Sequence, residues 1–260
     1  MPNAASLFVS HGAPTFALEP GQLGPKLGQF GARHGDISAV LVVSAHWQTR
    51  GLEVMTTAVP ATMHDFGGFP DALYQLQYPA PGAPELATEA GRLLRDAGFE
   101  VDVASRRGLD HGAWVPLRFL RPRADVPVFQ VSMSFDLDAS GAGRMGAALE
   151  PLRKRGVMIL GSGSLTHNLG EFSPGVLQPA AYVGEFVAWV RGAVERNDLD
   201  SLLQYRELAP HARRAHPTEE HFLPLLVAMS ARQSTDRVEV LEGGIEHGML
   251  SMDSFAWAGD

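Results

Sequence analysis

The stretch Val40-Leu41-Val42-Val43-Ser44, which runs into Ala45-His46-Trp47, decides the fold class of this chain. A short apolar run rich in β-branched residues predicts a strand that is buried on both faces. Similar runs predict further strands over residues 6–10, 52–56, 100–103, 126–131, 157–161 and 237–241. Amphipathic stretches separate these runs, and the alternation predicts an α/β fold with a largely buried sheet.

The amphipathic stretches predict helices over residues 85–97, 143–155 and 182–197, and in a segment after Pro217. The first is well marked, because Pro84 suits the first turn of a helix and Gly98 suits its exit. The start of the last segment is open. A helix could begin at Pro217 but would be interrupted by Pro224, so a new helix beginning near Pro224 is an equal alternative.

The composition favours one domain over residues 1–260 and excludes several classes of protein. A length of 260 residues suits a single domain, and no linker, repeat or low-complexity tract divides the chain. The chain has 10 histidines and no cysteine, which excludes disulfide scaffolds, thiolate zinc sites, iron–sulfur clusters and cysteine nucleophiles. Any transition metal must therefore be bound by imidazole and carboxylate groups.

Charge and hydropathy limit the partners of the protein. The net charge of −8 repels nucleic-acid phosphates and anionic membranes. The longest apolar runs, residues 39–43 and 223–229, are far shorter than the roughly 20 residues that cross a bilayer. Residues 1–12 do not resemble a signal peptide. We expect a cytoplasmic protein that binds neither nucleic acid nor membranes. The sequence does not determine the oligomeric state, and both a monomer and a homo-oligomer stay open.

Histidines follow three of the predicted strands at their carboxyl ends. His11 follows strand 6–10, His46 follows Ser44, and His167 follows strand 157–161 after a short turn. Open α/β sheets bind ligands at this edge, where the loops after neighbouring strands diverge. One such histidine would most simply be a capping or hydrogen-bonding residue. Three at similar offsets favour a shared metal or catalytic site.

Other histidines are less clearly placed. His216 and His221 are five residues apart, about 140° around a helix, so one helix would not direct both at one ion and only one is expected to be a ligand. His111 precedes a glycine, which allows close approach of the backbone to a ligand. His64 lies in MHDFGGFP, residues 63–70, whose composition suits a mobile aromatic flap as well as a plain surface turn.

The sequence GSGS at 161–164 is close to known catalytic motifs but matches none of them. It is neither the GxSxG nucleophile elbow nor the GxGxxG dinucleotide loop, because Thr166 stands at the position of the third glycine. The HExxH signature of metalloproteases is absent from the sequence. A serine hydrolase that pairs Ser162 or Ser164 with His167 stays open as an alternative.

Eight short motifs, spread in order along nearly the whole chain, together carry a family resemblance. They are HGAP at 11–14, VVSAHW at 42–47, HDFGGFP at 64–70, YPAPGAP at 78–84, DHGAWVPL at 110–117, GSGSLTHNL at 161–169, HPTEEHFLPL at 216–225 and GIEHGMLSM at 244–252. This combination resembles the DODA-type extradiol ring-opening dioxygenases, in the superfamily of the catalytic subunit of protocatechuate 4,5-dioxygenase. The resemblance implies a single α/β domain with a mixed, mostly parallel sheet flanked by helices and a metal site at the carboxyl ends of the strands.

The resemblance also assigns roles to individual histidines. It implies that His11, His46 and His221 bind the metal. His167 matches the catalytic acid–base histidine, which in some relatives counts as a fourth metal ligand, and His111 matches a second histidine near the substrate. Relatives can have asparagine at the position of His216, which makes this residue a neighbour of the site and not a ligand.

The nature of the metal is less constrained, because neutral imidazoles suit iron, zinc and copper alike. The wider superfamily binds its metal with two histidines and a glutamate. The candidates for such a carboxylate here are Glu220 and Glu246, which would either bind the metal or contact a residue that does. We expect Fe(II) for catalysis, because zinc has no redox chemistry. Zn²⁺ is expected in the purified protein, since it generally binds such sites more tightly than Fe(II).

The resemblance implies an enzyme that opens a catechol ring such as that of DOPA with O₂, giving a muconic semialdehyde-type product. His167 would accept and return a proton, and His111 would hydrogen-bond the substrate. Trp47, His64 and Phe66 would cover the ring, with ordinary packing as the alternative for each. Two other hypotheses are a zinc-dependent hydrolase with the same histidines and a noncatalytic metal- or small-molecule-binding protein on this scaffold.

Overall fold

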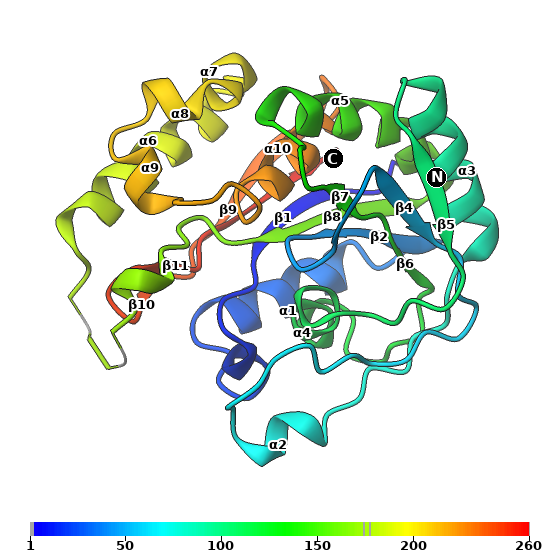
Figure 1. Ribbon diagram of the computed structural model, residues 1–260, viewed down its shortest axis with the longest axis horizontal. Coiled ribbons are helices and arrows are strands. Elements are labelled where there is room, and N and C mark those ends of the chain that lie inside the picture. Colours follow the sequence, from blue (N-terminus) through cyan, green and yellow to red (C-terminus); the bar gives the residue numbers. More distant parts are fainter. Residues whose placement is uncertain (1–2, 174, 177, 260) are drawn as a thin grey trace.

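A central sheet of six strands organises the fold, in the order β6-β2-β8-β1-β12-β9 (Figure 1). The computed structural model describes residues 3–173, 175–176 and 178–259. The strands are β1 (Ser6–Ser10), β2 (Ala39–Ser44), β6 (Val128–Gln130), β8 (Val157–Gly163), β9 (Arg237–Leu241) and β12 (Ser254–Ala258). β6, β2, β8 and β1 run parallel, whereas β12 is antiparallel to both β1 and β9. The prediction of a mixed, mostly parallel sheet is confirmed.

Helices cover both faces of this sheet, as expected for an α/β domain (Figure 1). On one face α10 (Leu223–Ser230) packs on β8 and β1, and α5 (Ala139–Leu149) packs on α10. On the other face α4 (His111–Leu120) packs on β2 and β8, and α1 (Leu23–Arg33) packs on α4. Strands β1, β2 and β8 are buried along their whole length, which explains why they appear in the sequence as continuous apolar runs.

The remaining elements are short or peripheral. The other helices are α2 (Asp71–Tyr74), α3 (Pro84–Asp96), α6 (Ala181–Glu195), α7 (Leu199–Leu203), α8 (Tyr205–Leu208) and α9 (Ala212–Ala215), with 3-10 turns at Pro14–Ala17, Glu150–Arg155 and Leu169–Glu171. Small two-stranded ribbons pair β3 (Gln48–Thr49) with β7 (Met133–Ser134), β4 (Leu52–Met55) with β5 (Val101–Ala104), and β10 (Ile245–Glu246) with β11 (Leu250–Ser251). None of the helices in the described part of the chain has the length and apolar character needed to cross a membrane.

Prolines determine two helix boundaries, of which the first differs from the sequence prediction. The helix predicted over 143–155 begins earlier and ends at Leu149, and Pro151 lies in the 3-10 turn that follows. A proline inside an α-helix removes a backbone hydrogen bond, so the chain changes helix type there. The segment after Pro217 takes the second of the two alternatives, since α10 begins at Leu223 with Pro224 in its first turn.

Glycines in β8 allow the first turn of α10 and the residues just before it to lie directly on the sheet. A Cβ atom at Gly161 would lie 2.1 Å from the carbonyl oxygen of Pro224, and one at Gly163 would lie 2.1 Å from that of His221. The backbone N–H of Ser164 donates a hydrogen bond to the same His221 carbonyl, at 2.9 Å. A side chain at either glycine would therefore push His221 away from the carboxyl edge of the sheet, where His11 and His46 lie.

Candidate active site

Five histidines converge at the carboxyl edge of the parallel strands. His11 follows β1, His46 follows β2, His111 begins α4, His167 follows β8, and His221 precedes α10. The ring centroids of His11, His46 and His221 lie 4.8 to 5.5 Å apart. Segments that are distant in the sequence thus place their imidazoles around one point.

The nitrogen atoms of three of these rings are arranged as metal ligands would be. Ligand atoms of His11, His46 and His221 lie within 4.8 Å of one another, and the Nε2 atoms of His11 and His46 are 2.9 Å apart. Two nitrogens bound to one ion at about 2.1 Å would lie roughly 3.0–3.4 Å apart. Within the described part of the chain, the buried Nε2 of His221 has no hydrogen-bond partner. These residues fit a metal ion.

Neighbouring oxygens fix which nitrogen is free in two of the three rings. The hydroxyl of Ser162 donates to the carbonyl of Gly112, so it can only accept from Nδ1 of His11, at 2.9 Å. The Glu220 carboxylate likewise accepts from Nδ1 of His221, at 3.1 Å. The proton of His11 and that of His221 are therefore on Nδ1, and the lone pair of Nε2 in each of these two rings faces the cluster.

Burial keeps these imidazoles neutral. It lowers the pKa of His11 and of His221 well below the ordinary value, and the neighbouring histidines lower both further. The pKa of His46 falls to about 3, again through burial first and then through the nearby His111. A metal ion binds the neutral form of histidine, so few protons compete with it here at neutral pH.

The other two histidines each lie against a different ring of this group. The ring of His167 stacks on that of His221, with centroids 3.4 Å apart and planes 10° apart. The ring of His111 lies against that of His46, at 3.9 Å between centroids. Burial lowers the pKa of His167, although Glu220 partly opposes this effect. A neutral imidazole of this kind can accept a proton from a bound ligand.

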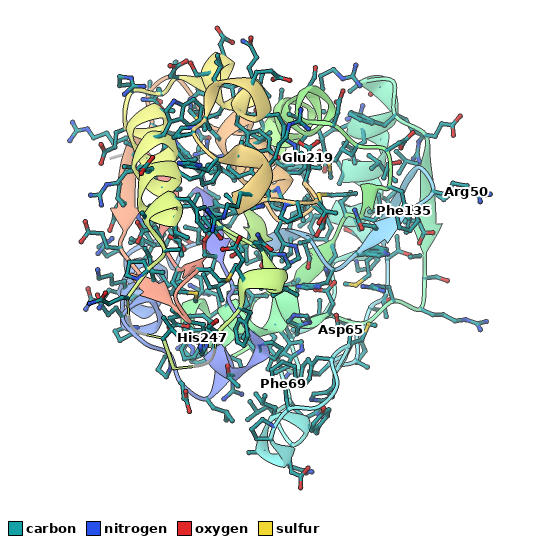
Figure 2. All side chains as sticks on the ribbon, turned by 60° about the vertical axis from the view of Figure 1, so that its left-hand side comes forward. Arg50, Asp65, Phe69, Phe135, Glu219 and His247 are labelled. Atoms are coloured by element: carbon teal, nitrogen blue, oxygen red, sulfur yellow. The ribbon has the colours of Figure 1, made fainter. Side chains whose placement is uncertain are left out.

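The cluster forms the floor of a cavity of about 380 Å³ whose walls are mostly apolar. The walls include Phe66, Phe69, Leu169, Phe172 and Leu250. Figure 2 shows Phe69 and Asp65 beside the projecting lobe that carries α2. An apolar enclosure with a few convergent polar groups is the usual form of a site for a small, flat ligand.

Comparison with known proteins identifies the family. Residues 28–251 match the family described as the catalytic LigB subunit of aromatic ring-opening dioxygenase. The chain belongs to this family. It is an extradiol ring-opening dioxygenase and hence an oxidoreductase, and the prediction made from the sequence motifs is confirmed.

Individual relatives of this LigB-family enzyme cover nearly its whole length. The 4,5-DOPA dioxygenase extradiol of Beta vulgaris is 38% identical over 255 residues, which cover 96% of this chain and 95% of that protein. The protein of the same name from Escherichia coli is 37% identical, covering 95% and 92%. A crystal structure of an uncharacterized protein from Escherichia coli K12 superposes with a TM-score of 0.80 at 29% identity, covering 97% and 99%.

Of the three residues predicted to cover the substrate ring, Phe66 lines the cavity, whereas Trp47 and His64 do not, as far as the structure describes its lining. Trp47 is buried in the core with the guanidinium of Arg107 over its ring, at 4.7 Å. Nε2 of His64 hydrogen-bonds the carbonyl of Leu76, at 3.0 Å. The side chain directions of these two loop residues are set by packing.

The predicted neighbours of the metal site separate into one that contacts it and two that do not. Glu220 bonds His221, and both residues also border a second cavity on the side of Phe135. Glu246 is outside the described histidine cluster and lines another cavity, together with His247. Burial raises the pKa of the Glu246 carboxyl group. His216 lies in the core, where its Nε2 bonds the carbonyl of Leu165, and it belongs to none of the described groups of possible metal ligands.

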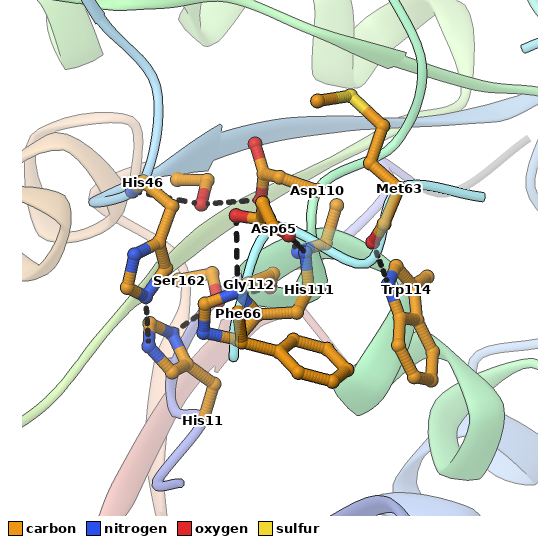
Figure 3. Close-up of polar contacts among 12 residues, drawn as sticks. His11, His46, Met63, Asp65, Phe66, Asp110, His111, Gly112, Trp114 and Ser162 are labelled. Atoms are coloured by element: carbon orange, nitrogen blue, oxygen red, sulfur yellow. Dashed lines mark hydrogen bonds and ion pairs between the residues drawn. The ribbon is translucent and has the colours of Figure 1, made fainter. Parts of the chain in front are cut away.

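Two residues that support the site did not stand out in the sequence. Asp110 caps α4 by accepting from the N–H of Ala113, and its carboxylate also accepts from Ser44 at 2.7 Å and Gln130 at 2.8 Å. It thereby fixes the turn that presents His111. The pattern of an aspartate before the first helical residue is a recognisable cap signal. The second residue is Asp65, which contacts His111 (Figure 3).

His216 makes the stability of the metal-free protein depend on pH. Burial lowers its pKa to about 3, whereas a histidine of the unfolded chain titrates near 6.5. Below about pH 6.5 the unfolded chain therefore binds a proton at this residue that the folded chain does not bind. Each further decrease of one pH unit lowers the free energy of unfolding by up to about 1.4 kcal/mol. The variant His216→Gln retains a donor for the Leu165 carbonyl but does not titrate. Its unfolding free energy should therefore depend less steeply on pH, by up to about 1.4 kcal/mol per pH unit, which is the contribution of one proton.

Urea unfolding in the presence of a chelator, at pH values from about 8 down to about 5, measures this slope. At the upper end His216 is neutral in the folded and the unfolded chain, so the difference in unfolding free energy between the wild type and His216→Gln there reports the change in packing alone. Equal slopes for both proteins between about pH 6.5 and 5 would show that His216 is not the group that resists protonation.

Proposed function

We propose that this enzyme opens the ring of a DOPA-like catechol with O₂ at a non-haem Fe(II) ion, giving a muconic semialdehyde-type product. The observation that carries the proposal is the convergence of unprotonated imidazole nitrogens on the floor of an apolar cavity. The names of the relatives in Beta vulgaris and Escherichia coli support DOPA as the first substrate to test. We further propose that residues 1–260 form one catalytic domain that works in the cytoplasm.

We propose that His11, His46 and His221 hold the metal through Nε2, with Ser162 and Glu220 orienting two of the rings. A bound Fe(II) ion would supply the redox chemistry that links oxidation of the catechol to reduction of O₂, whereas Zn²⁺ in the purified protein would be inactive because it has no redox chemistry. Family membership favours this reaction over a zinc hydrolase or a noncatalytic binding protein.

The flanking histidines would handle protons. His167, neutral and open to the cavity, would accept a proton from a catechol hydroxyl and return it as the ring opens. His111, which lies against His46 and lines the same cavity, would hydrogen-bond a substrate oxygen. Phe66 and Phe69 would pack against the ring and exclude water from it. The protein contributes orientation and proton transfer, and both oxygen atoms of O₂ enter the product.

The test is anaerobic reconstitution of the apoprotein with Fe(II), addition of DOPA, and then admission of O₂. We expect stoichiometric oxygen consumption with formation of a yellow product, and no consumption by the zinc-loaded protein. A panel of catechols with other ring substituents would define the substrate. The absence of oxygen consumption over that panel, together with ester or amide hydrolysis by the zinc form, would exclude the dioxygenase proposal.

A further inference from the structure

Asp65 joins the aromatic wall of the cavity to the helix that carries His111 (Figure 3). Its Oδ1 accepts a hydrogen bond from the backbone N–H of His111, at 2.8 Å. Its Oδ2 lies 3.0 Å from Nδ1 of the same residue, a second polar contact, between the two side chains. One carboxylate thus contacts both the backbone and the ring of His111 from a segment 46 residues away in the sequence.

The segment that carries Asp65, residues 63–70, is attached at its start and free at its tip; we name it the flap. At its start the carbonyl of Met63 accepts from the indole of Trp114, at 2.8 Å. At the tip, a Cβ atom built on Gly67 or Gly68 would have no neighbour within 4 Å among the described residues. The contact of Asp65 with α4 lies between these two parts, where it can hold the flap closed.

The flap places aromatic rings over the cavity next to His111. The ring of Phe66 meets that of His111 edge-on, at 5.6 Å between centroids, and packs on Phe69 at 5.5 Å. Both phenylalanines line the cavity. Opening of the flap would therefore move the apolar wall and remove the carboxylate from His111 in the same motion.

The charge of Asp65 suits this contact. Burial raises the pKa of its carboxyl group, but the contacts with His111 outweigh this and leave the pKa below its ordinary value. An ionised carboxylate can only accept, so it favours the tautomer of His111 with the proton on Nδ1. Nε2 is then unprotonated and able to accept from a ligand hydroxyl. Carboxylates orient histidines in this way in many metal sites.

We propose that Asp65 is a positioning residue that couples closure of the flap to the orientation of His111. With the flap open, substrate enters and His111 is free to rotate and to exchange tautomers. With the flap closed, Asp65 fixes the ring and its proton while Phe66 covers the substrate. Substrate binding thus completes the site by closing the flap. This inference rests on the proposed function and adds a residue that acts through His111.

The test compares Asp65→Ala and Asp65→Asn with Asp71→Asn, a matched change of an exposed carboxylate at the start of α2. We expect kcat with DOPA to fall about 10- to 100-fold in both Asp65 variants. KM, metal content and Tm should change little, and Asp71→Asn should behave as the wild type. Formate should restore part of the kcat of Asp65→Ala, because Asp65 is reached from solvent; lost packing would not be restored by formate.

A second readout does not depend on activity. In the zinc-loaded protein, hydrogen exchange at the backbone amide of His111 should accelerate in Asp65→Ala and not in Asp71→Asn. Nitrogen-15 spectra of the imidazoles should show His111 with its proton on Nδ1 in the wild type and as a mixture of tautomers in Asp65→Ala. These measurements still test the role of Asp65 if the wild type opens no catechol, an outcome that would contradict only the proposed function.

Two results would overturn the inference. One is wild-type kcat in Asp65→Ala together with an unchanged exchange rate at His111. The other is a loss of bound metal that parallels the loss of kcat. Ligand atoms of His46, Asp65 and His111 also lie within 4.8 Å of one another, and parallel loss would make Asp65 part of a metal site instead of a positioning residue.

Discussion

His46→Ala protein should retain almost no iron or zinc after reconstitution and desalting, whereas the wild type should retain close to one ion per chain. Nε2 of His46 lies 2.9 Å from that of His11, and both face the free Nε2 of His221. Removal of this ring leaves two imidazoles. Loss of a partner that only orients a ligand costs about 10- to 100-fold in metal affinity, so loss of a ligand itself should cost more than about 100-fold.

The measurement is metal content by mass spectrometry, with the dissociation constant from chelator competition. His34→Ala is the matched control, because it removes an imidazole at the end of α1, outside the cluster. Addition of Zn²⁺ should raise the Tm of the wild type and of His34→Ala but not that of His46→Ala, since an ion that binds only the folded state stabilises it. Full metal content in a folded His46→Ala protein would contradict the proposed ligand set.

The histidine convergence could be predicted because it depends on the parallel strands. An apolar run predicts a buried strand, parallel strands end at one edge, and a histidine at that end must lie near the others. His11 and His46 follow from this reasoning alone, since β1 and β2 both pair with β8. His221 does not follow a strand. Its position depends on close packing over Gly161 and Gly163, and only the family resemblance indicated it.

The parts that could not be predicted depend on contacts between distant segments. Helix α4 has Pro116 in its interior and begins with a histidine and a glycine, a pattern that favours a loop. Burial of nearly the whole helix between β2 and α1 overrides this local preference. The flap is a similar case, because its role also depends on a contact with a distant segment. Its sequence indicated the aromatic side chains, but it did not indicate that Asp65 contacts His111 while His64 bonds Leu76.

The second large effect is expected at His167, where removal of the imidazole should lower kcat strongly and leave the metal in place. In the structure this ring lies flat on His221, with centroids 3.4 Å apart. An imidazole nitrogen directs its lone pair within its own ring plane. The planes of these two rings are nearly parallel, so one ion would not lie in both planes. Proton transfer by a positioned side chain contributes about 10²- to 10⁴-fold, and we expect kcat of His167→Ala to fall within this range.

His167→Phe distinguishes proton transfer from stacking, because phenylalanine keeps a flat ring against His221 and has no nitrogen. Both variants should retain wild-type metal content and lose kcat to a similar extent, whereas His211→Ala, at an exposed position bonded to Glu185, should retain activity. If His167→Phe were active and His167→Ala inactive, the role of the ring would be to support His221. If both lost the metal, His167 would be a fourth ligand and the catechol proton would need another acceptor in the cavity, with His111 the nearest candidate.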